Sequence, residues 1–323
     1  MGINGLNTFL KEKVPDCIKE VHFSDFKGQK VAIDTSIYFY KFLYKNDRYI
    51  EGFFQQIYRL MSNGILPVYI FDGIPPPEKK EILEQRKEKK LSLNKSIQEL
   101  ECKINSNNLG ETTLEEKELL EKLKKKNIYV KKSYYDNLKH FLDLIGIPYL
   151  QCHEEADLLC NTLVIKNKVD LIMSDDMDIL VGGAKHILRN FNINNNKILF
   201  YDMNCIQKAL GLTEAQWVNL CVLSGCDYCP RIHGVGVKNA YKFIQKHTLD
   251  EIFAILSYKA PIDYIEKFNR SRELFLKIIE NETTNTVEFN KNESKPELLK
   301  FIKEYTNLTD KQIQNRLKII NQV

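Results

Sequence analysis

The sequence predicts an α/β fold, with a central, mostly parallel sheet flanked by helices. Two observations predict it: short apolar runs that end in acidic residues recur along the chain, and helical patterns that end in glycine lie between them. This strand–helix–strand order is typical of parallel sheets. The chain has 323 residues, 43% of them hydrophobic, which is enough for one large domain or two smaller ones.

Four segments show the strand pattern, and each is followed closely by acidic residues. They are KVAID at 30–34, LPVYIFDG at 66–73, IPYL at 147–150 with HEEAD after it, and VDLIMSDDMD at 169–178. In open parallel sheets, ligands bind beyond the carboxyl ends of the strands. We therefore expect all four segments to deliver negative charge to one edge of the sheet.

Helices are predicted at 51–64 and 133–146, and an antiparallel hairpin with an Asn-rich turn is predicted at 186–202. The region 79–132 differs from its neighbours, because it is rich in Lys and Glu with Leu and Ile at helical spacing. A polar stretch at 105–110 interrupts it. We interpret this region as two charged helices joined by a polar turn and inserted into the α/β domain.

The acids at the sheet edge are the candidate chemical centre. Carboxylates gathered in one place repel each other, so they need a cation or hydrogen-bond donors. Two divalent ions fit this requirement, since carboxylates and water are ligands that Mg²⁺ and Mn²⁺ prefer. Two such metal ions close together also suit phosphodiester hydrolysis. A single aspartate is more often a helix cap or a solvated loop residue, and an acidic pocket like that of response regulators or phosphatases is an alternative. The candidate ligands are Asp34, Asp72, Glu155, Asp157, Asp176, Asp178 and Asp227.

Lys79 and Arg86 lie seven positions apart in a predicted helix, which places them on one face where both can reach one phosphate. A stretch of charged residues like this one is more often a helix whose charged side chains simply face solvent. Tyr40 follows the first acid-tipped strand and belongs either to the core or to a surface that stacks on an unpaired base.

The segment GVGVKNAYKF at 234–243 opens an amphipathic helix with two glycines. Such a turn can present backbone N–H groups to a phosphate, as a helix–hairpin–helix does, although it is also an ordinary way to begin a helix. Gly234, Gly236 and the neighbouring Lys238 are the candidate contacts to a nucleic-acid backbone.

Composition limits which binding partners and which cellular setting we expect for the protein. The net charge is only +4, so no chain-wide positive charge drives binding. The eight cysteines form no regular framework, which predicts reduced thiols in an intracellular setting, and Cys226 and Cys229 are interpreted as packing residues. The N-terminus has no signal-peptide core, and no apolar run reaches membrane-spanning length, so we expect no membrane partner.

Together, the motifs MGINGL, KVAIDTS, YIFDG, GIPYL…EEAD, SDDMDIL and SGCDY…GVG resemble the flap endonuclease family, within the 5′-nuclease superfamily that includes the XPG-type nucleases. The resemblance covers residues 2 to about 320. It implies a PIN-like nuclease fold and a structure-specific 5′ nuclease that cuts DNA at 5′ flaps and junctions by two-metal catalysis, in replication and repair. A 5′-to-3′ exonuclease acting mainly on double-stranded DNA is the alternative.

The resemblance also implies residue roles. The seven acids would bind two Mg²⁺ ions, with Mn²⁺ as a substitute, while Lys79 and Arg86 contact the scissile phosphate. Tyr40 would stack on a base, and Gly2 would lie close to the active site. A helix–two-turn–helix at about 218–247 would grip DNA and bind K⁺ through Ser224, Arg231 and Val235.

By the same resemblance, residues 1–323 form a single nuclease domain. Its parts are an N-terminal region at 1–78, a helical arch at 79–132, an internal nuclease region at 133–247 and a C-terminal helical region at 248–323. The expected substrate is branched or flapped DNA, and the expected location is the nucleus or another site of DNA replication.

The chain departs from the family pattern in two places. The stretch before DRYIEGFF is short, where flap endonucleases carry a longer loop, and LKIINQV contains no sliding-clamp motif. Clamp binding is therefore not expected, and we expect a monomer. A catalytically inactive nucleic-acid-binding scaffold and an RNA-directed nuclease of the PIN type are the competing classes.

Overall fold

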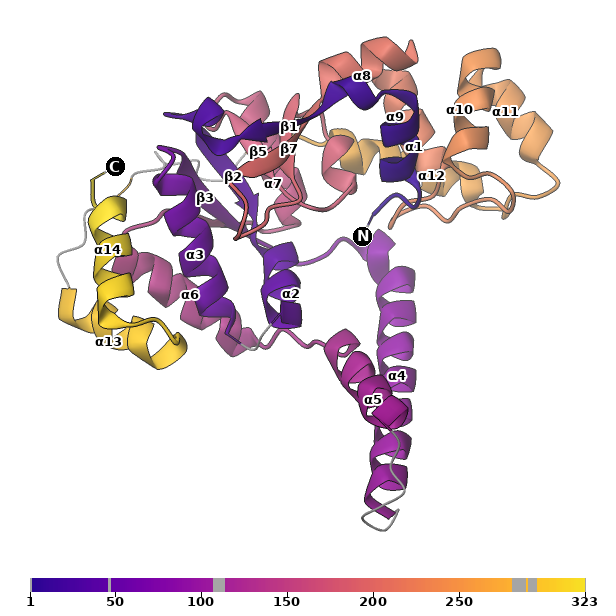
Figure 1. Cartoon of the computed structure of the whole chain (residues 1–323). Coiled ribbons are helices and arrows are strands. Elements are labelled where there is room, and N and C mark those ends of the chain that lie inside the picture. Colours follow the sequence, from indigo (N-terminus) through magenta and orange to yellow (C-terminus); the bar gives the residue numbers. More distant parts are fainter. Residues whose placement is uncertain (1, 46–47, 107–113, 281–288, 290–294, 323) are drawn as a thin grey trace.

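The computed structural model describes residues 2–45, 48–106, 114–280, 289 and 295–322. A seven-stranded sheet lies at its centre (Figure 1). The strands are β1 (Ile18–His22), β2 (Lys30–Asp34), β3 (Leu66–Phe71), β4 (Tyr149–Gln151), β5 (Leu171–Met173), β6 (His186–Arg189) and β7 (Lys197–Asp202). Their order across the sheet is β1-β7-β6-β5-β2-β3-β4.

Five neighbouring strands, from β6 to β4 in this order, run parallel, as the sequence predicts. β2 pairs in parallel with both β3 and β5, while β4 and β6 extend the sheet on either side. The predicted hairpin is confirmed as the antiparallel pair of β6 and β7. The third predicted strand begins later than expected, at Tyr149, because Pro148 before it has no N–H to donate to a ladder.

Both faces of the sheet are buried, because successive side chains of each strand point to opposite sides. In β2, Ala32 packs in one core, whereas Val31 and Ile33 pack in the other. The first core also contains Trp217 and the second contains Phe53.

The structure contains the following α-helices, most of which lie on the two sides of the sheet (Figure 1). They are α1 (Leu6–Lys13), α2 (Thr35–Lys45), α3 (Tyr49–Met61), α4 (Lys80–Ser106), α5 (Leu114–Lys126), α6 (Lys132–Ile145), α7 (Ala156–Ile165), α8 (Met203–Leu210), α9 (Glu214–Leu223), α10 (Val237–Lys246), α11 (Leu249–Leu256), α12 (Tyr264–Leu276), α13 (Lys295–Tyr305) and α14 (Asp310–Ile320). The predicted helices at 51–64 and 133–146 correspond to α3 and α6.

The two charged helices predicted at 79–132 are α4 and α5, which project together away from the sheet (Figure 1). Ion pairs join them, with Lys124 Nζ 2.8 Å from Glu101 and Lys103 Nζ 2.7 Å from Glu116. Residues 107–110 of the predicted polar turn lie outside the described residues.

The prediction of reduced cysteines is wrong for one pair. Cys17 and Cys205 form a disulfide, with their Cα atoms 5.4 Å apart. Because 188 positions separate them in the sequence, only the packing of the chain brings them together. Cys226 and Cys229 remain thiols, and the backbone N–H of Cys226 donates to the Cys229 carbonyl at 3.0 Å.

Among the described residues, no helix combines the length and the apolar content that crossing a membrane requires.

Candidate active site

The carboxyl ends of the parallel strands bring the predicted acids to one edge of the sheet. Asp34 is the last residue of β2, and Asp72 directly follows β3. Asp176 follows β5, while Glu155 and Asp157 begin α7 after β4. Strands with these registers end side by side, which is why residues far apart in sequence meet here.

A cavity of about 250 Å³ opens between these strand ends. Its walls include six of the seven predicted acids together with both predicted basic residues, Lys79 and Arg86. The seventh acid, Asp178, is 3% exposed and lines a smaller adjoining cavity with Glu155 and Asp157. The structure therefore brings together residues that span positions 34 to 227 in one acidic centre.

Burial raises the pKa of three of these carboxyl groups. For Asp34, burial is the main cause, and repulsion from Asp72 and Asp176 adds to it. Burial and then the charge of Glu155 raise the pKa of Asp157 to about 7. For these groups the charged state is costly unless a cation lies close to them.

Asp178 has a raised pKa for similar reasons, since burial acts first and the charges of Asp176 and Asp227 act next. Its Oδ1 atom is buried without a hydrogen-bond partner among the described residues. A buried carboxylate oxygen with no donor is the kind of group that a metal ion can satisfy.

Two cations of the chain already lie among the acids. Lys79 Nζ donates to Glu155 and lies 3.6 Å from Asp227 Oδ2, and Arg86 Nη2 donates to Asp227 Oδ1 at 2.7 Å. Burial lowers the pKa of Lys79, but the charges of Glu155 and Asp157 outweigh burial, so the pKa lies above its ordinary value. The predicted basic pair and the predicted acids are thus in direct contact.

The donor set fits divalent ions in its chemistry, because hard carboxylate oxygens predominate and two of the acids, Asp34 and Asp178, are buried. Within the described ranges, no three His, Cys, Asp or Glu side chains converge closely enough to hold an ion as they stand. Lys79 and Arg86 balance part of this negative charge through their ion pairs with Glu155 and Asp227.

Tyr228 is a site residue that the sequence reasoning missed. Its hydroxyl donates to Glu155 Oε2, and its ring centroid lies 5.0 Å from Lys79 Nζ. Burial, followed by the charges of Asp157 and Glu155, raises the pKa of Tyr228, so the hydroxyl keeps its proton and acts as a donor. The only signal in the sequence was its place directly after Asp227.

Ser174 and Asp175 also escaped prediction. The Ser174 hydroxyl donates to Asp34 Oδ2 at 2.8 Å and accepts from the backbone N–H of Asp176 at 3.0 Å, so it ties two predicted ligands together. Asp175 turns the other way and accepts from Lys41 Nζ at 2.6 Å. Arg189 donates to the carbonyl groups of Asp175 and Asp176, which anchors the loop after β5.

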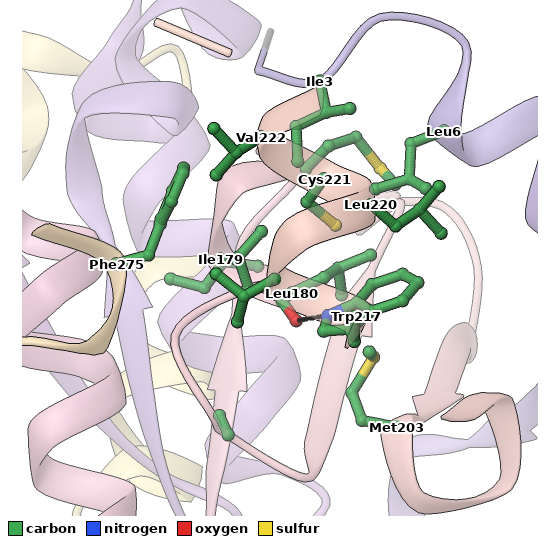
Figure 2. Close-up of a cluster of buried hydrophobic side chains, with 14 of the residues drawn as sticks. Ile3, Leu6, Ile179, Leu180, Met203, Trp217, Leu220, Cys221, Val222 and Phe275 are labelled. Atoms are coloured by element: carbon green, nitrogen blue, oxygen red, sulfur yellow. Dashed lines mark hydrogen bonds between the residues drawn. The ribbon is translucent and has the colours of Figure 1, made fainter. Parts of the chain in front are cut away.

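Gly2 lies against this loop. A Cβ atom added to Gly2 would be 2.9 Å from Asp178 Cγ and would also meet Asp176. Next to Gly2, Ile3 and Leu6 are buried in the same core as Leu180 and Leu220 (Figure 2). The Trp217 indole N–H donates to the Leu180 carbonyl at 2.9 Å and so ties α9 to the acidic loop (Figure 2).

Tyr40 projects from α2 and is 37% exposed, whereas Tyr38 two positions earlier is fully buried in the core. Burial raises the pKa of Tyr40, the nearby Arg86 lowers it, and Asp72 raises it. The ring therefore lies beside the acidic cavity, which favours the stacking interpretation over the core interpretation.

The predicted glycine turn joins α9 to α10. Gly234 has a φ of +80°, which favours glycine, and no atoms surround the position of a Cβ there. Gly236 has a φ of −86° and caps α10, so its backbone conformation is open to residues other than glycine. Lys238 lies in the first turn of α10 and pairs with Glu12 at 2.6 Å.

The three residues predicted to bind K⁺ lie in the same connection. The Ser224 hydroxyl is buried and donates to the Leu220 carbonyl at 2.7 Å. The backbone of Arg231 approaches so closely that a Cβ at Gly225 would lie 3.0 Å from the Arg231 Cα. The Val235 N–H donates to the Ile232 carbonyl at 2.9 Å, closing the turn.

Comparisons with known protein families match the two parts of the chain that carry the candidate acids and the basic pair. The XPG N-terminal domain matches residues 1–93, and the XPG I-region matches residues 146–227. The chain is 32% identical to flap endonuclease 1 of Homo sapiens in an alignment that covers 98% of this chain and 86% of that relative. It is 34% identical to flap endonuclease 1 of Ovis aries, covering 85% of this chain and 75% of the relative.

Solved structures share the fold. The catalytic core of Rad2 in complex with DNA substrate matches with a TM-score of 0.71 at 23% identity, covering 99% of each chain. Flap endonuclease-1 from Methanococcus jannaschii matches with a TM-score of 0.68 at 20% identity, covering 94% of this chain and 95% of that one.

Proposed function

Because the chain belongs to the flap endonuclease family, with its PIN-like fold, it is a structure-specific 5′ nuclease, and we propose that its acidic cavity is the centre that cuts DNA at 5′ flaps and junctions. One observation carries the proposal: six of the seven candidate ligands line one cavity with Lys79 and Arg86. An inactive scaffold would gain nothing from so many mutually repelling carboxylates.

The family is metal-dependent, and we assign the metal sites here to the seven acids as a set. The expected ions are two Mg²⁺, with Mn²⁺ as a substitute. When bound, such ions lower the pKa of water and neutralise charge on the leaving oxygen. The raised pKa values of Asp34, Asp157 and Asp178 support this assignment, since an adjacent cation would relieve the cost of their charge.

Lys79 and Arg86 would then exchange partners. They pair with Glu155 and Asp227, and a divalent ion held by those acids would compete with both cations for the same carboxylate oxygens. Their side chains already line the cavity, so the scissile phosphate is the natural new partner. There they would stabilise the negative charge that develops in the transition state.

Other residues would place the DNA. Tyr40, which is 37% exposed on α2, would stack on an unpaired base, and α4 with α5 would act as an arch over the 5′ single strand. Gly2 leaves room beside Asp178 that any side chain would fill. A single domain with this arch at 79–132 remains our proposal for the organisation of the chain.

The glycine turn between α9 and α10 would hold the duplex. Backbone N–H groups after Gly234 and the ammonium of Lys238 would contact phosphates without reading bases. K⁺ bound by Ser224, Arg231 and Val235 would assist this contact. The proposed partner is branched or flapped DNA. The protein would bind it as a monomer, in the nucleus or at another site of replication.

Cleavage-product sizes test the proposal directly. Labelled 5′-flap, gapped and blunt duplex DNA should be incubated with Mg²⁺ and with EDTA. A flap nuclease releases the intact flap as one product near the duplex boundary, whereas a 5′-to-3′ exonuclease releases mononucleotides or short pieces from the blunt duplex. Cleavage of none of the three, or cleavage that persists in EDTA, would contradict the proposal.

A further inference from the structure

A small aromatic and basic cluster lies beyond the acidic cavity. The ammonium of Lys90, on α4, is 5.6 Å from the centroid of the Tyr40 ring and 4.5 Å from the centroid of the Tyr129 ring. Both tyrosines are partly exposed, Tyr40 by 37% and Tyr129 by 45%. Two exposed rings from different parts of the chain therefore flank one cation.

Tyr129 is held in place by hydrogen bonds around its edge. Its hydroxyl accepts from Asn94 Nδ2 at 2.8 Å, and Lys90 Nζ donates to the neighbouring carbonyl of Ile128 at 3.1 Å. The segment that carries Tyr129 joins α5 to α6 and runs past the end of α2 (Figure 1). The hydroxyl is thus bonded to α4 and the ring lies against Lys90, while Tyr129 as a whole stays 45% exposed.

The cluster continues the line of the proposed active site. Arg86, Lys90 and Asn94 are spaced four residues apart in α4, so they lie on one face of the helix. Arg86 contacts Asp227 at the cavity, and Asn94 contacts Tyr129 at the other end of this row. A strand leaving the cavity along this face would pass Tyr40 first and Tyr129 next.

The chemistry of the cluster suits an unpaired nucleotide. Tyrosine rings stack on any base without regard to sequence, and basic side chains beside them neutralise the backbone phosphate. A base stacked on Tyr129 would replace the Lys90 ammonium on the ring, and the same nucleotide would bring a phosphate to pair with it. Charge balance is kept in this exchange, because one cation changes partners.

We propose that Tyr129 is a second stacking surface for an unpaired nucleotide of the 5′ strand, farther from the cut than Tyr40. This inference rests on the proposed function, since it needs a single strand that leaves the acidic cavity along α4. It adds a binding subsite that selects substrates with an unpaired 5′ segment of sufficient length to reach it.

Fluorescence of 2-aminopurine tests the proposal without cleavage. The base analogue should be placed at successive flap positions, and the full-length protein should be added in EDTA. We expect one position beyond the first unpaired nucleotide to lose fluorescence on binding, because stacking quenches the analogue. Tyr129→Phe should keep this change and Tyr129→Leu should lose it.

An abasic flap supplies the matching perturbation on the DNA. Removing the base at the responsive position should weaken binding by the wild type by about 5-fold or more. The same abasic substitution should change little in Tyr129→Leu, which has no ring to lose. Tyr258→Leu is the matched control, because Tyr258 is 77% exposed, lies under Lys259 at 5.1 Å and is far from this cluster in sequence.

Each outcome decides something. If no flap position responds differently in Tyr129→Leu and in the wild type, the subsite does not exist. If Tyr129→Leu weakens normal and abasic flaps equally, Tyr129 only braces the arch, and the stacking role is excluded. If the wild type cuts no flap with Mg²⁺, the proposed function fails first, which is a separate result from the fluorescence.

Discussion

Lys79 and Tyr228 share one carboxylate: both donate hydrogen bonds to Glu155, and the Lys79 ammonium lies 5.0 Å from the centroid of the Tyr228 ring. The candidate metal ligand Glu155, the candidate phosphate contact Lys79 and the buried Tyr228 therefore all contact one another. The orientation of Glu155 depends on the tyrosine hydroxyl, and the position of Lys79 depends on the tyrosine ring.

Tyr228→Phe should raise the Mg²⁺ concentration needed for cleavage by about 10-fold, because groups that orient metal ligands have effects of this size. The ring stays, so Lys79 should keep its position and DNA affinity should change little. Single-turnover rates across an Mg²⁺ titration give the result. Tyr69→Phe, which removes the bond from a buried hydroxyl to Gln56, is the matched control. An unchanged Mg²⁺ requirement would show that the hydroxyl does not position Glu155.

Asp178→Asn should reduce cleavage by several powers of ten while DNA binding persists. The buried carboxylate has an oxygen without a hydrogen-bond partner in the part of the chain that the structure describes, and its pKa is raised, so its charge serves metal binding rather than folding. Thermal stability in EDTA should rise, because repulsion from Asp176 and Asp227 is relieved. Melting curves and single-turnover rates on flap DNA measure both effects. Near-normal cleavage would remove the two-metal interpretation.

In EDTA, the stability of the protein should depend on pH through Asp157, whose pKa is raised from its ordinary 3.8 to about 7 in the fold. A carboxyl group with a raised folded pKa stabilises the fold fully at low pH, and that contribution disappears as the pH rises from about 4 to about 7. Urea unfolding in EDTA between pH 5 and pH 8 should therefore show a smaller pH dependence for Asp157→Asn than for the wild type. Parallel curves for the two proteins would contradict the burial of this charge.

Gly234 and Gly236 should respond differently to the same substitution. Gly234→Ala forces a side chain into a φ of +80°, at a cost of about 1 kcal/mol, whereas Gly236→Ala keeps a φ of −86° in open space. Only the first should weaken binding of duplex-bearing flap DNA, and replacing K⁺ with Li⁺ at equal ionic strength should have a similar effect on the wild type. Binding to short single strands is the control. Equal losses on both kinds of DNA would indicate a folding defect and no specific grip on the duplex.

Lys79→Ala and Arg86→Ala should slow the chemical step more than they weaken junction binding, since both side chains line the acidic cavity. Single-turnover rates at saturating protein, set beside dissociation constants, separate the two effects. Weak binding with normal cutting at saturation would assign the pair to a general basic face of α4.

The candidate ligands could be predicted from the sequence because acid-tipped strands obey a topological rule. Asp34 and Asp72 follow adjacent parallel strands, and such strands must end at the same edge of the sheet. Helices α4 and α5 could be predicted for a similar reason, since charged residues with helical spacing need no distant partner to form a helix.

Residues that act through distant neighbours left no such signal. Ser174 and Tyr228 look like ordinary polar and aromatic residues until the fold places their hydroxyl groups on Asp34 and Glu155. Cys17 and Cys205 pair across 188 positions, and no spacing rule predicts such a partner. Of the two glycines in the turn, only Gly234 has a left-handed backbone conformation, and the glycine pattern in the sequence does not say which of the two it is.

The sequence alone thus determined the class of sheet, the acids at its edge and the charged helical insert, because each depends on local periodicity or on the order of strands along the chain. The tertiary structure alone decided which cations balance those acids, which hydroxyl groups orient them and how Tyr40 and Tyr129 come to share Lys90. These contacts are set by the packing of segments that are distant in sequence, and side-chain packing at distances of a few ångströms is not encoded in any local pattern.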